Sequence, residues 1–445
     1  MELISQIPIF GGFMSTMLAF IIVIGIVVFV HEYGHYIVGR WTGIHAETFS
    51  MGMGPVIWSR VDKRGTKWQL AAVPVGGYVK FLGDRTAASE ADFEALDSMT
   101  DAERSRSFPA AKVFNRALTV AAGPLANFLL ASFIFAGLIL WQGISTDTTK
   151  VGELVATPYE GYDLRVGDEV LEVNGQTVSS FGDVINITLD MDTPRDMELL
   201  IQRDDSTLYV TAPYLLIPAV YSVEPLSAAS LAGLQEGDVV LEAGGQEVVA
   251  FSELQAIVLA SSDTEILLKV WRDGLILDLP ITPTLREFPD GNGGFEDRVM
   301  IGVYGALAFL PASETPTPWR AAYLGVKQTG NVITTTLNSI KHMFLGNLSP
   351  TNLQGPVGIA QISKETANQG LISFISLIAV ISTGIGLLNL FPVPMLDGGH
   401  LLFFAYEAVR GRPPSQKTIQ ALMSIGLAMV LLLMVFTTYN DVMRL

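Results

Sequence analysis

Residues 13–35 read FMSTMLAFIIVIGIVVFVHEYGH, an apolar stretch that ends in two histidines. No charged residue occurs in residues 3–30, and a helix continuing through this stretch exceeds the roughly 20 residues needed to cross a bilayer. His31 and His35 lie four residues apart on one helical face, where both rings can reach one zinc ion. Glu32 can then act as general base on a zinc-activated water. Because ionisable groups in lipid are costly, the stretch predicts zinc-dependent hydrolysis within or just below the bilayer surface.

Composition narrows the classes of protein that fit this chain. Of 445 residues, 49% are hydrophobic and only 16% are charged, well below the ~25% of a soluble domain. These values indicate several membrane spans together with a sizeable soluble part. The net charge of −17 argues against nucleic acid as a partner. The absence of cysteine excludes disulfides and thiolate ligands, so any zinc must be held by His, Asp or Glu.

Four uncharged stretches are long enough to span a membrane: residues 3–30, 117–146, 366–396 and 418–440. The loop after the first stretch is basic, with seven Lys or Arg against three acids in residues 40–85, and the loop between the last two stretches is also basic. The positive-inside rule therefore predicts that both loops are cytoplasmic and that both termini lie outside. The long region between the second and third stretches is then external.

This orientation predicts a third metal ligand. The third span enters from outside, so its C-terminal end reaches the depth of His31 and His35. There the chain reads NLFPVPMLDG over residues 389–398, which delivers Asp397 to that depth. A catalytic zinc needs three protein ligands and leaves the fourth position for water. We therefore expect Asp397 to be the third ligand, although an Asp that only ends a helix before a Gly-Gly turn would look the same in sequence.

The external region contains an internal repeat with a period of 70 residues. Nine of fifteen positions are identical between residues 164–178 and 234–248, and Phe181 pairs with Phe251. A Gly-Asp turn, a short apolar run and a Gly-Gln turn in each copy predict strand–turn–strand. Residues 150–315 carry a local net charge of −20, which says little about topology because long domains translocate largely regardless of charge.

Two further segments are expected near the membrane. Residues 46–83 are rich in Val, Gly and aromatic residues and follow the zinc motif directly, which favours a β element at the interface. The basic residues among apolar positions in residues 319–344 predict an amphipathic surface helix. His45, His342 and His400 are interpreted as polar or interfacial residues rather than ligands, although His400 follows Asp397 by only three residues.

Three motifs together resemble the site-2 proteases, and among them the regulator-of-sigma-E group of Gram-negative bacteria. They are HEYGH at 31–35, GPLAN at 123–127 and NLFPVPMLDG at 389–398. The resemblance implies an intramembrane zinc metalloprotease of the bacterial inner membrane, acting in regulated proteolysis during stress. Its substrate would be a single-span membrane protein, such as an anti-sigma factor already trimmed outside by another protease. Asn127, within GPLAN, is interpreted as structural.

Carried over by the resemblance, His31, His35 and Asp397 hold Zn²⁺ and Glu32 is the catalytic base. Asn389 matches the asparagine that the family would use to hold substrate or to order the site. A helix-packing asparagine, hydrogen-bonded across helices, is an equal alternative for Asn389.

The resemblance extends to the other segments. Each repeat copy resembles a PDZ domain, and such domains bind extended peptides by adding them to a sheet edge. The tandem copies either bind peptides or only occupy the space above the site. The resemblance implies that they lie in the periplasm and act as a size filter that excludes substrates with bulky external domains. Residues 46–83 resemble the family's membrane-entering β element, whose free strand edge would bind an unwound substrate helix.

The predicted fold is therefore a multi-pass α-helical membrane protein with four spans, a membrane-associated β element and two tandem PDZ-like α+β domains. The predicted divisions are a first span with the zinc motif, a cytoplasmic loop with the β element, a second span, the two PDZ-like domains, an amphipathic helix region, a third span with the LDG motif, a cytoplasmic loop and a fourth span. In order, these cover residues 1–38, 39–111, 112–146, 147–218, 219–310, 311–365, 366–397, 398–417 and 418–445.

Two rival interpretations fit parts of this pattern. One is a membrane zincin of another family, whose third ligand is a glutamate on a later helix, but the candidate spans contain no such glutamate. The other is a membrane-anchored PDZ scaffold that binds peptides without cleaving them and does not need the two motifs intact.

Overall fold

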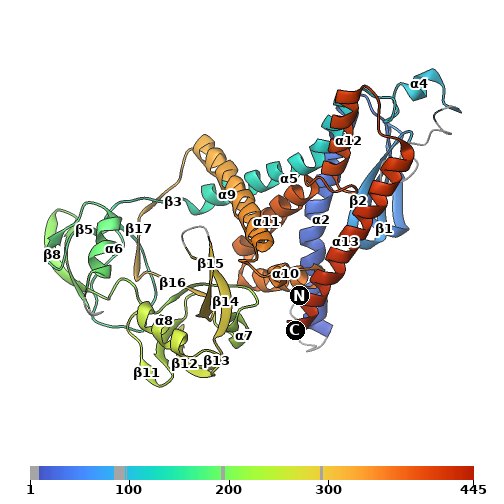
Figure 1. Cartoon of the computed structure of the whole chain (residues 1–445). Coiled ribbons are helices and arrows are strands. Elements are labelled where there is room, and N and C mark those ends of the chain that lie inside the picture. The colour runs from blue at the N-terminus through green and yellow to red at the C-terminus, as the bar shows by residue number, and fades with distance from the viewer. Residues whose placement is uncertain (1–9, 85–95, 97, 192–195, 291–293, 445) are drawn as a thin grey trace. The chain divides into compact units, whose positions relative to one another are not determined.

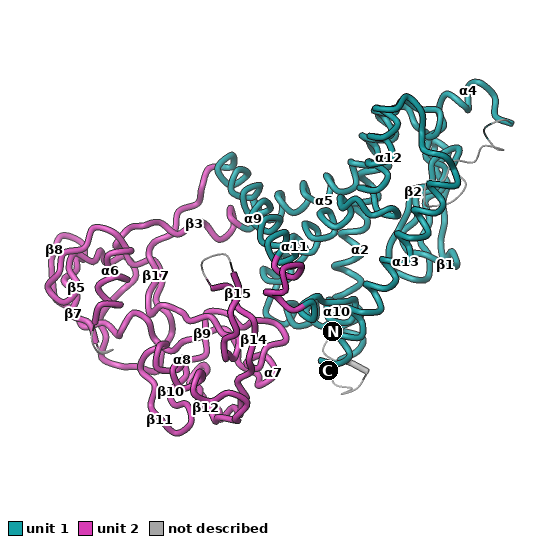
Figure 2. Tube along the Cα trace, viewed as in Figure 1, with its two compact units in different colours: residues 1–138, 318–341, 350–445 teal, residues 139–317, 342–349 magenta. Residues whose placement is uncertain are grey.

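The computed structural model describes residues 10–84, 96, 98–191, 196–290 and 294–444. The chain forms two compact units (Figure 2). The first comprises residues 1–138, 318–341 and 350–445, and the second comprises residues 139–317 and 342–349. Residues 3–9 of the first predicted span, and Arg85 of the basic loop, lie outside the described residues.

Four described helices are long and apolar enough to cross a membrane, as predicted. They are α2 (Phe10–Trp41), α5 (Val113–Gln142), α11 (Leu371–Asn389) and α13 (Gln416–Met443). Large apolar side chains point away from the protein along them, with Phe133 of α5 78% exposed and Leu432 of α13 75% exposed. Such apolar surface is favourable in lipid, where each helix also satisfies its own backbone hydrogen bonds.

The third spanning helix is shorter at both ends than the predicted 366–396. Residues up to 369 belong to a separate helix, α10 (Pro356–Gln369), and α11 begins only after Gly370. Gly370 has φ of +129°, which side chains disfavour, so the chain changes direction there. At the other end, Pro392 and Pro394 cannot donate backbone hydrogen bonds, and the chain leaves the helix before them.

The remaining helices of the described chain are α4 (Asp101–Arg104), α7 (Ala228–Ala232), α9 (Pro318–Leu345), α12 (Asp397–Arg410) and a 3₁₀ turn, η1 (Pro350–Asn352), besides two in the repeat below. The helix α9 matches the predicted amphipathic segment. Much of the predicted loop 398–417 is instead the helix α12, because the run after Gly399 is apolar on one face.

A β-hairpin lies along α2 in the first unit (Figure 1). Its antiparallel strands are β1 (Ala46–Val61) and β2 (Lys67–Phe81), interrupted by several register shifts. The ring of Phe49 stacks on Trp68 at a centroid distance of 4.3 Å, and Tyr36 of α2 meets Trp68 edge-on at 5.2 Å. The predicted β element is therefore fixed to the zinc-motif helix by aromatic packing.

The second unit contains two copies of one α+β fold, as the 70-residue repeat predicted. The first copy has strand order β6-β5-β7-β8 and the second has order β11-β10-β12-β13. Their elements are β5 (Glu169–Val173), β6 (Gln176–Thr177), α6 (Phe181–Leu189), β7 (Met197–Arg203) and β8 (Ser206–Ala212), then β10 (Val239–Ala243), β11 (Gln246–Glu247), α8 (Phe251–Ala260), β12 (Ile266–Arg272) and β13 (Leu275–Ile281).

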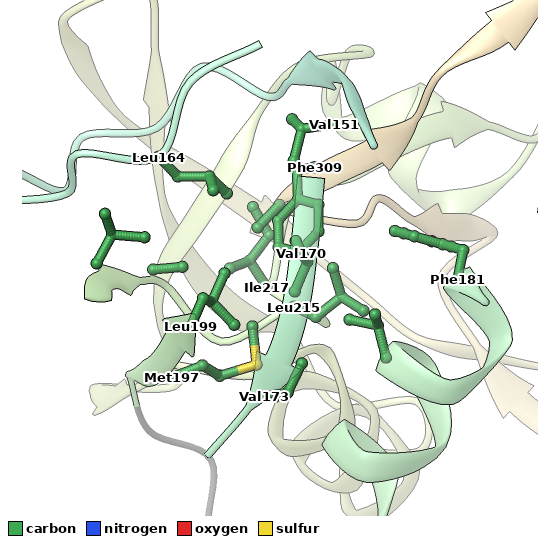
Figure 3. Packing of buried hydrophobic residues seen from close by; sticks show 14 of the residues in the cluster. Val151, Leu164, Val170, Val173, Phe181, Met197, Leu199, Leu215, Ile217 and Phe309 are labelled. Atoms are coloured by element: carbon green, nitrogen blue, oxygen red, sulfur yellow. The ribbon is translucent and has the colours of Figure 1, made fainter. Parts of the chain in front are cut away.

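Each copy has its own apolar core and the same ion pair, in which an arginine binds a buried aspartate. Met197, Leu199 and Ile201 of β7 are fully buried in the core of the first copy (Figure 3). Beside it, Arg203 Nε donates to Asp168 Oδ1 at 2.8 Å, and in the second copy Arg272 Nε donates to Asp238 Oδ1 at 2.6 Å. Burial alone would raise the pKa of Asp168, but the hydrogen bonds from Arg203 and from the Arg165 backbone N–H outweigh it and lower that pKa.

The copies are nested rather than consecutive. The strand β4 (Val151–Leu154) pairs with β17 (Phe309–Pro311), and β3 (Ile144–Ser145) pairs with β18 (Ser313–Glu314). Inside them, β9 (Val220–Val223) pairs with β16 (Val303–Gly305), and β14 (Thr284–Pro289) with β15 (Phe295–Met300). The predicted division at residues 218 and 310 is corrected accordingly: Phe309 is buried in the core of the first copy, which the chain completes only after the second.

Candidate metal centre

The helix α2 presents both motif histidines toward one point. His31 and His35 are buried, and their Nε2 atoms lie 3.2 Å apart. The i and i+4 positions of a helix face the same side, which explains why two side chains from one element converge. Glu32 lies beside them and lines the same cavity.

Asp397 reaches this point from the other end of the chain. It is the first residue of α12, and its Oδ2 lies 3.2 Å from His31 Nε2 and 3.5 Å from His35 Nε2. The structure thus brings together the three residues predicted as ligands. Oδ2 is buried and, in the described part of the chain, makes no hydrogen bond. It faces the two ring nitrogens instead.

The three donor atoms fit a zinc ion. Tetrahedral zinc with bonds of about 2.0–2.2 Å holds its ligand atoms about 3.3–3.6 Å apart. The edges of the present triangle, 3.2, 3.2 and 3.5 Å, are close to that geometry. Two imidazoles and one carboxylate also form a donor set typical of catalytic zinc, in which a fourth position stays open.

Gly398 and Gly399 allow the loop before Asp397 to pack closely against the start of α12. A Cβ on Gly398 would lie 2.3 Å from the carbonyl oxygens of Leu390 and Phe391, and one on Gly399 would lie 2.4 Å from that of Val393. The residues before Asp397 can therefore fold back onto the start of α12. Met395 in this loop has φ of +110°, a strained conformation for a residue with a side chain.

The helix α5 forms the wall behind the histidines. Thr119, Gly123 and Asn127 recur at four-residue spacing and so lie on one face. His35 Nδ1 donates to the backbone oxygen of Thr119 at 3.0 Å, which leaves its Nε2 free to act as a ligand. A Cβ on Gly123 would lie 2.3 Å from His35 Nε2, so only glycine allows the rings to approach this helix.

The strand β2 closes the side of the centre that holds Glu32. A Cβ on Gly77 would lie 3.0 Å from Glu32 Cγ, so the strand backbone runs directly against the glutamate. The cavity between them has a volume of about 300 Å³. Asn389, the last residue of α11, lines it, as does His400.

The sequence predicted the two histidines, Glu32 and Asp397 as members of this centre, but it did not indicate which glycines pack against them. His45 contacts Arg106 and His342 contacts Asn347, and neither belongs to the cluster of possible ligands found among the described residues. The roles of Gly77 and Gly123 were not predicted, because nothing in a sequence shows which glycine meets a neighbouring backbone. The four-residue spacing of Thr119, Gly123 and Asn127 was the one available signal.

Comparisons with known proteins agree along nearly the whole chain. The model of peptidase family M50 matches residues 19–433. The regulator of sigma-E protease RseP of Escherichia coli and the regulator of sigma E protease of Haemophilus influenzae are each 31% identical, over 98% of this chain and 100% of their own. A protein of Agrobacterium fabrum named as a candidate zinc metalloprotease is 37% identical, over 98% of this chain and 97% of its own.

The close approach of α5 generates a prediction about Gly123. In Gly123→Ala the added methyl group displaces both rings, so the affinity for zinc should fall at least about tenfold. Gly137→Ala in the same helix is the matched control, because its Cβ meets no atom within 4 Å. Metal analysis of both purified variants in detergent measures the effect. Full zinc in Gly123→Ala would contradict the described packing.

Proposed function

We propose a role for each residue of the centre on one premise: the chain belongs to peptidase family M50, as its three motifs predicted. It is accordingly an intramembrane zinc metalloprotease. Membership of family M50 contradicts both rival interpretations. The chain is neither a membrane zincin of another family nor a PDZ scaffold that binds peptides without cleaving them. The observation that carries the assignment of roles is the triangle of His31, His35 and Asp397 with Glu32 beside it.

His31, His35 and Asp397 are the proposed ligands. A zinc ion held there supplies Lewis-acid activation of water and of the substrate carbonyl. Glu32 takes the proton from the attacking water and then passes it to the nitrogen of the leaving amine, so one carboxylate serves first as base and then as acid. The peptide bond is thereby exchanged for a carboxylate and an amine with no other co-reactant than water.

The substrate would lie along β2. In the two-stranded sheet, β1 occupies one edge of β2, and Gly76 and Gly77 of β2 line the cavity beside Glu32. A membrane helix protects its peptide bonds by internal hydrogen bonds, so it has to unwind before cleavage. An unwound segment can add to a strand edge through main-chain hydrogen bonds. Asn389, which lines the same cavity from the end of α11, is proposed to hold that segment.

The names of two relatives support a proposal for the physiological substrate class. Two relatives are named as regulators of sigma E, which supports an anti-sigma factor with a single span as substrate and the inner membrane as location. The loop charges support a periplasmic position for the repeat copies, on the membrane side opposite the basic loops. The pair of PDZ-like copies would then exclude substrates that keep a bulky external domain.

The second copy has the features of a peptide-binding groove. The strand β16 pairs with β9 in a two-stranded sheet, and its other side faces α8 across a cavity of about 360 Å³. Phe251, Leu254 and Val258 of α8 give the cavity an apolar lining. These features support binding of an extended peptide with an apolar side chain, by addition to β16.

Substitution of the centre separates the base from the ligands. Glu32→Gln keeps the shape of the side chain, so zinc should remain while hydrolysis of a truncated single-span substrate falls about 10²–10⁴-fold. Asp397→Ala removes a donor atom and should lose zinc as well as activity. Metal analysis and a cleavage assay with and without chelator distinguish the two. Full zinc and full activity in Asp397→Ala would disprove the proposed ligand set.

Removal of the repeat copies tests the size filter. Ser145 of β3 pairs directly with Ser313 of β18, so excision of residues 146–312 leaves ends that already lie side by side and can be joined by a short glycine linker. The shortened protein should cleave substrates that keep a folded external domain, which the full chain rejects. A chain carrying an unrelated compact domain of similar size in the same place should again reject them. Unchanged rejection after excision would disprove the filter.

Variants with one introduced cysteine test the peptide groove. The natural chain contains no cysteine, so a label attaches only at the chosen position. Gln255 lines the cavity, whereas the neighbouring Ala256 is exposed but does not. A polarity-sensitive fluorophore on Gln255→Cys should respond to short soluble peptides with apolar residues at alternate positions, and on Ala256→Cys it should not. An equal response at both positions, or none at either, would contradict a groove in the second copy.

A further inference from the structure

Asn127 is a buried polar residue for which the mechanism above has no use. Its side chain is 0% exposed, and its amide nitrogen lies 3.2 Å from Nδ1 of His31. Its Oδ1 has no hydrogen-bond partner within the described residues. A buried amide oxygen without a partner is unfavourable, so this arrangement requires an explanation.

The position of the proton on a metal-bound histidine explains this arrangement. When Nε2 of a neutral imidazole donates its lone pair to a metal ion, the proton is on Nδ1. Nδ1–H of His31 would then face the N–H₂ group of Asn127, and two donors cannot bond to each other. Rotation of the amide by about 180° about its terminal bond brings Oδ1 to Nδ1, and the partnerless acceptor receives the hydrogen bond.

His35, the neighbouring proposed ligand, makes an equivalent contact with α5. His35 Nδ1 donates to an oxygen of α5, the backbone carbonyl of Thr119, at 3.0 Å. Thr119 and Asn127 are eight residues apart, two turns of one helical face, with Gly123 midway between them. With the amide of Asn127 rotated as described, the helix α5 would offer one oxygen acceptor to each histidine. For His35 the acceptor is the backbone, and for His31 it is a side chain that can be changed.

Asn127 is itself held in place. Ser382 of α11 donates from Oγ to the backbone oxygen of Asn127 at 3.0 Å, and Gly386 of α11 comes so close that a Cβ there would lie 3.2 Å from Asn127 Cβ. A fixed backbone restricts where the short amide side chain can reach. The contact with His31 is therefore a built feature of the α2–α5–α11 packing.

We propose that Asn127 is a positioning residue for the metal centre: its Oδ1 accepts the hydrogen bond from His31 Nδ1–H and fixes the ring with Nε2 toward the metal ion. The inference rests on the proposed ligand role of His31. It predicts that Asn127 acts on metal affinity through His31 and does not contact substrate.

Two variants of similar size separate this role from packing. Asn127→Asp keeps the oxygen acceptor, and Asn127→Leu fills the same space without one. If Asn127 positions His31, the Leu variant should bind zinc about 10–100-fold more weakly and the Asp variant should stay within about threefold of the natural chain. If Asn127 only packs, the order reverses, because leucine is tolerated in a buried site and a charge is not.

The measurement is chelator competition for zinc by the purified full-length chain in detergent, which needs no substrate. Thermal unfolding of each variant identifies loss of folding. Gly137→Ala in the same helix, where an added Cβ meets no atom within 4 Å, should retain the natural affinity. Tight zinc binding by Asn127→Leu would overturn the proposal. Absence of tight zinc from the natural chain would instead overturn the ligand set on which it rests.

Discussion

The close approach of α2 and α5 is the constraint on which the metal centre depends. A Cβ on Gly34 would lie 2.4 Å from the backbone oxygen of Ala122, and one on Gly123 would meet both motif histidines. Small residues let membrane helices pack backbone against backbone, where van der Waals contact replaces the hydrophobic effect as the driving force. Only at this separation can oxygens of α5 reach the far sides of the two imidazole rings.

The second requirement is the fixed position of Asp397. Arg116 of α5 donates to Glu407 of α12 at 2.7 Å, and both side chains are largely buried. A buried ion pair adds little net stability, but removal of one partner leaves a costly charge, so such a pair fixes the place of two elements. Together with the glycine contacts of the loop, it sets the start of α12 where its carboxylate meets the histidines.

The second unit is built differently, because each of its two copies is organised around its own apolar core. Each copy buries a row of alternating apolar residues on its central strand and anchors a turn through an Asp–Arg pair. The short β3–β18 pair closes the two copies, so the segment 146–312 begins and ends at neighbouring positions. A domain joined in this way can be added to a membrane enzyme without disturbing its helices.

Patterns in the sequence were enough to predict the zinc-dependent hydrolysis and the kinds of helix and strand that build the protein. The i, i+4 spacing placed the rings of His31 and His35 at one point, the uncharged stretches predicted four long apolar helices, and the repeat predicted two copies of one fold. Only the tertiary structure decided how Phe309 returns to the first copy and that Asn127 faces His31. These features depend on contacts between residues far apart in the chain, where the available space and the pairing of buried polar atoms are fixed only once the helices have packed.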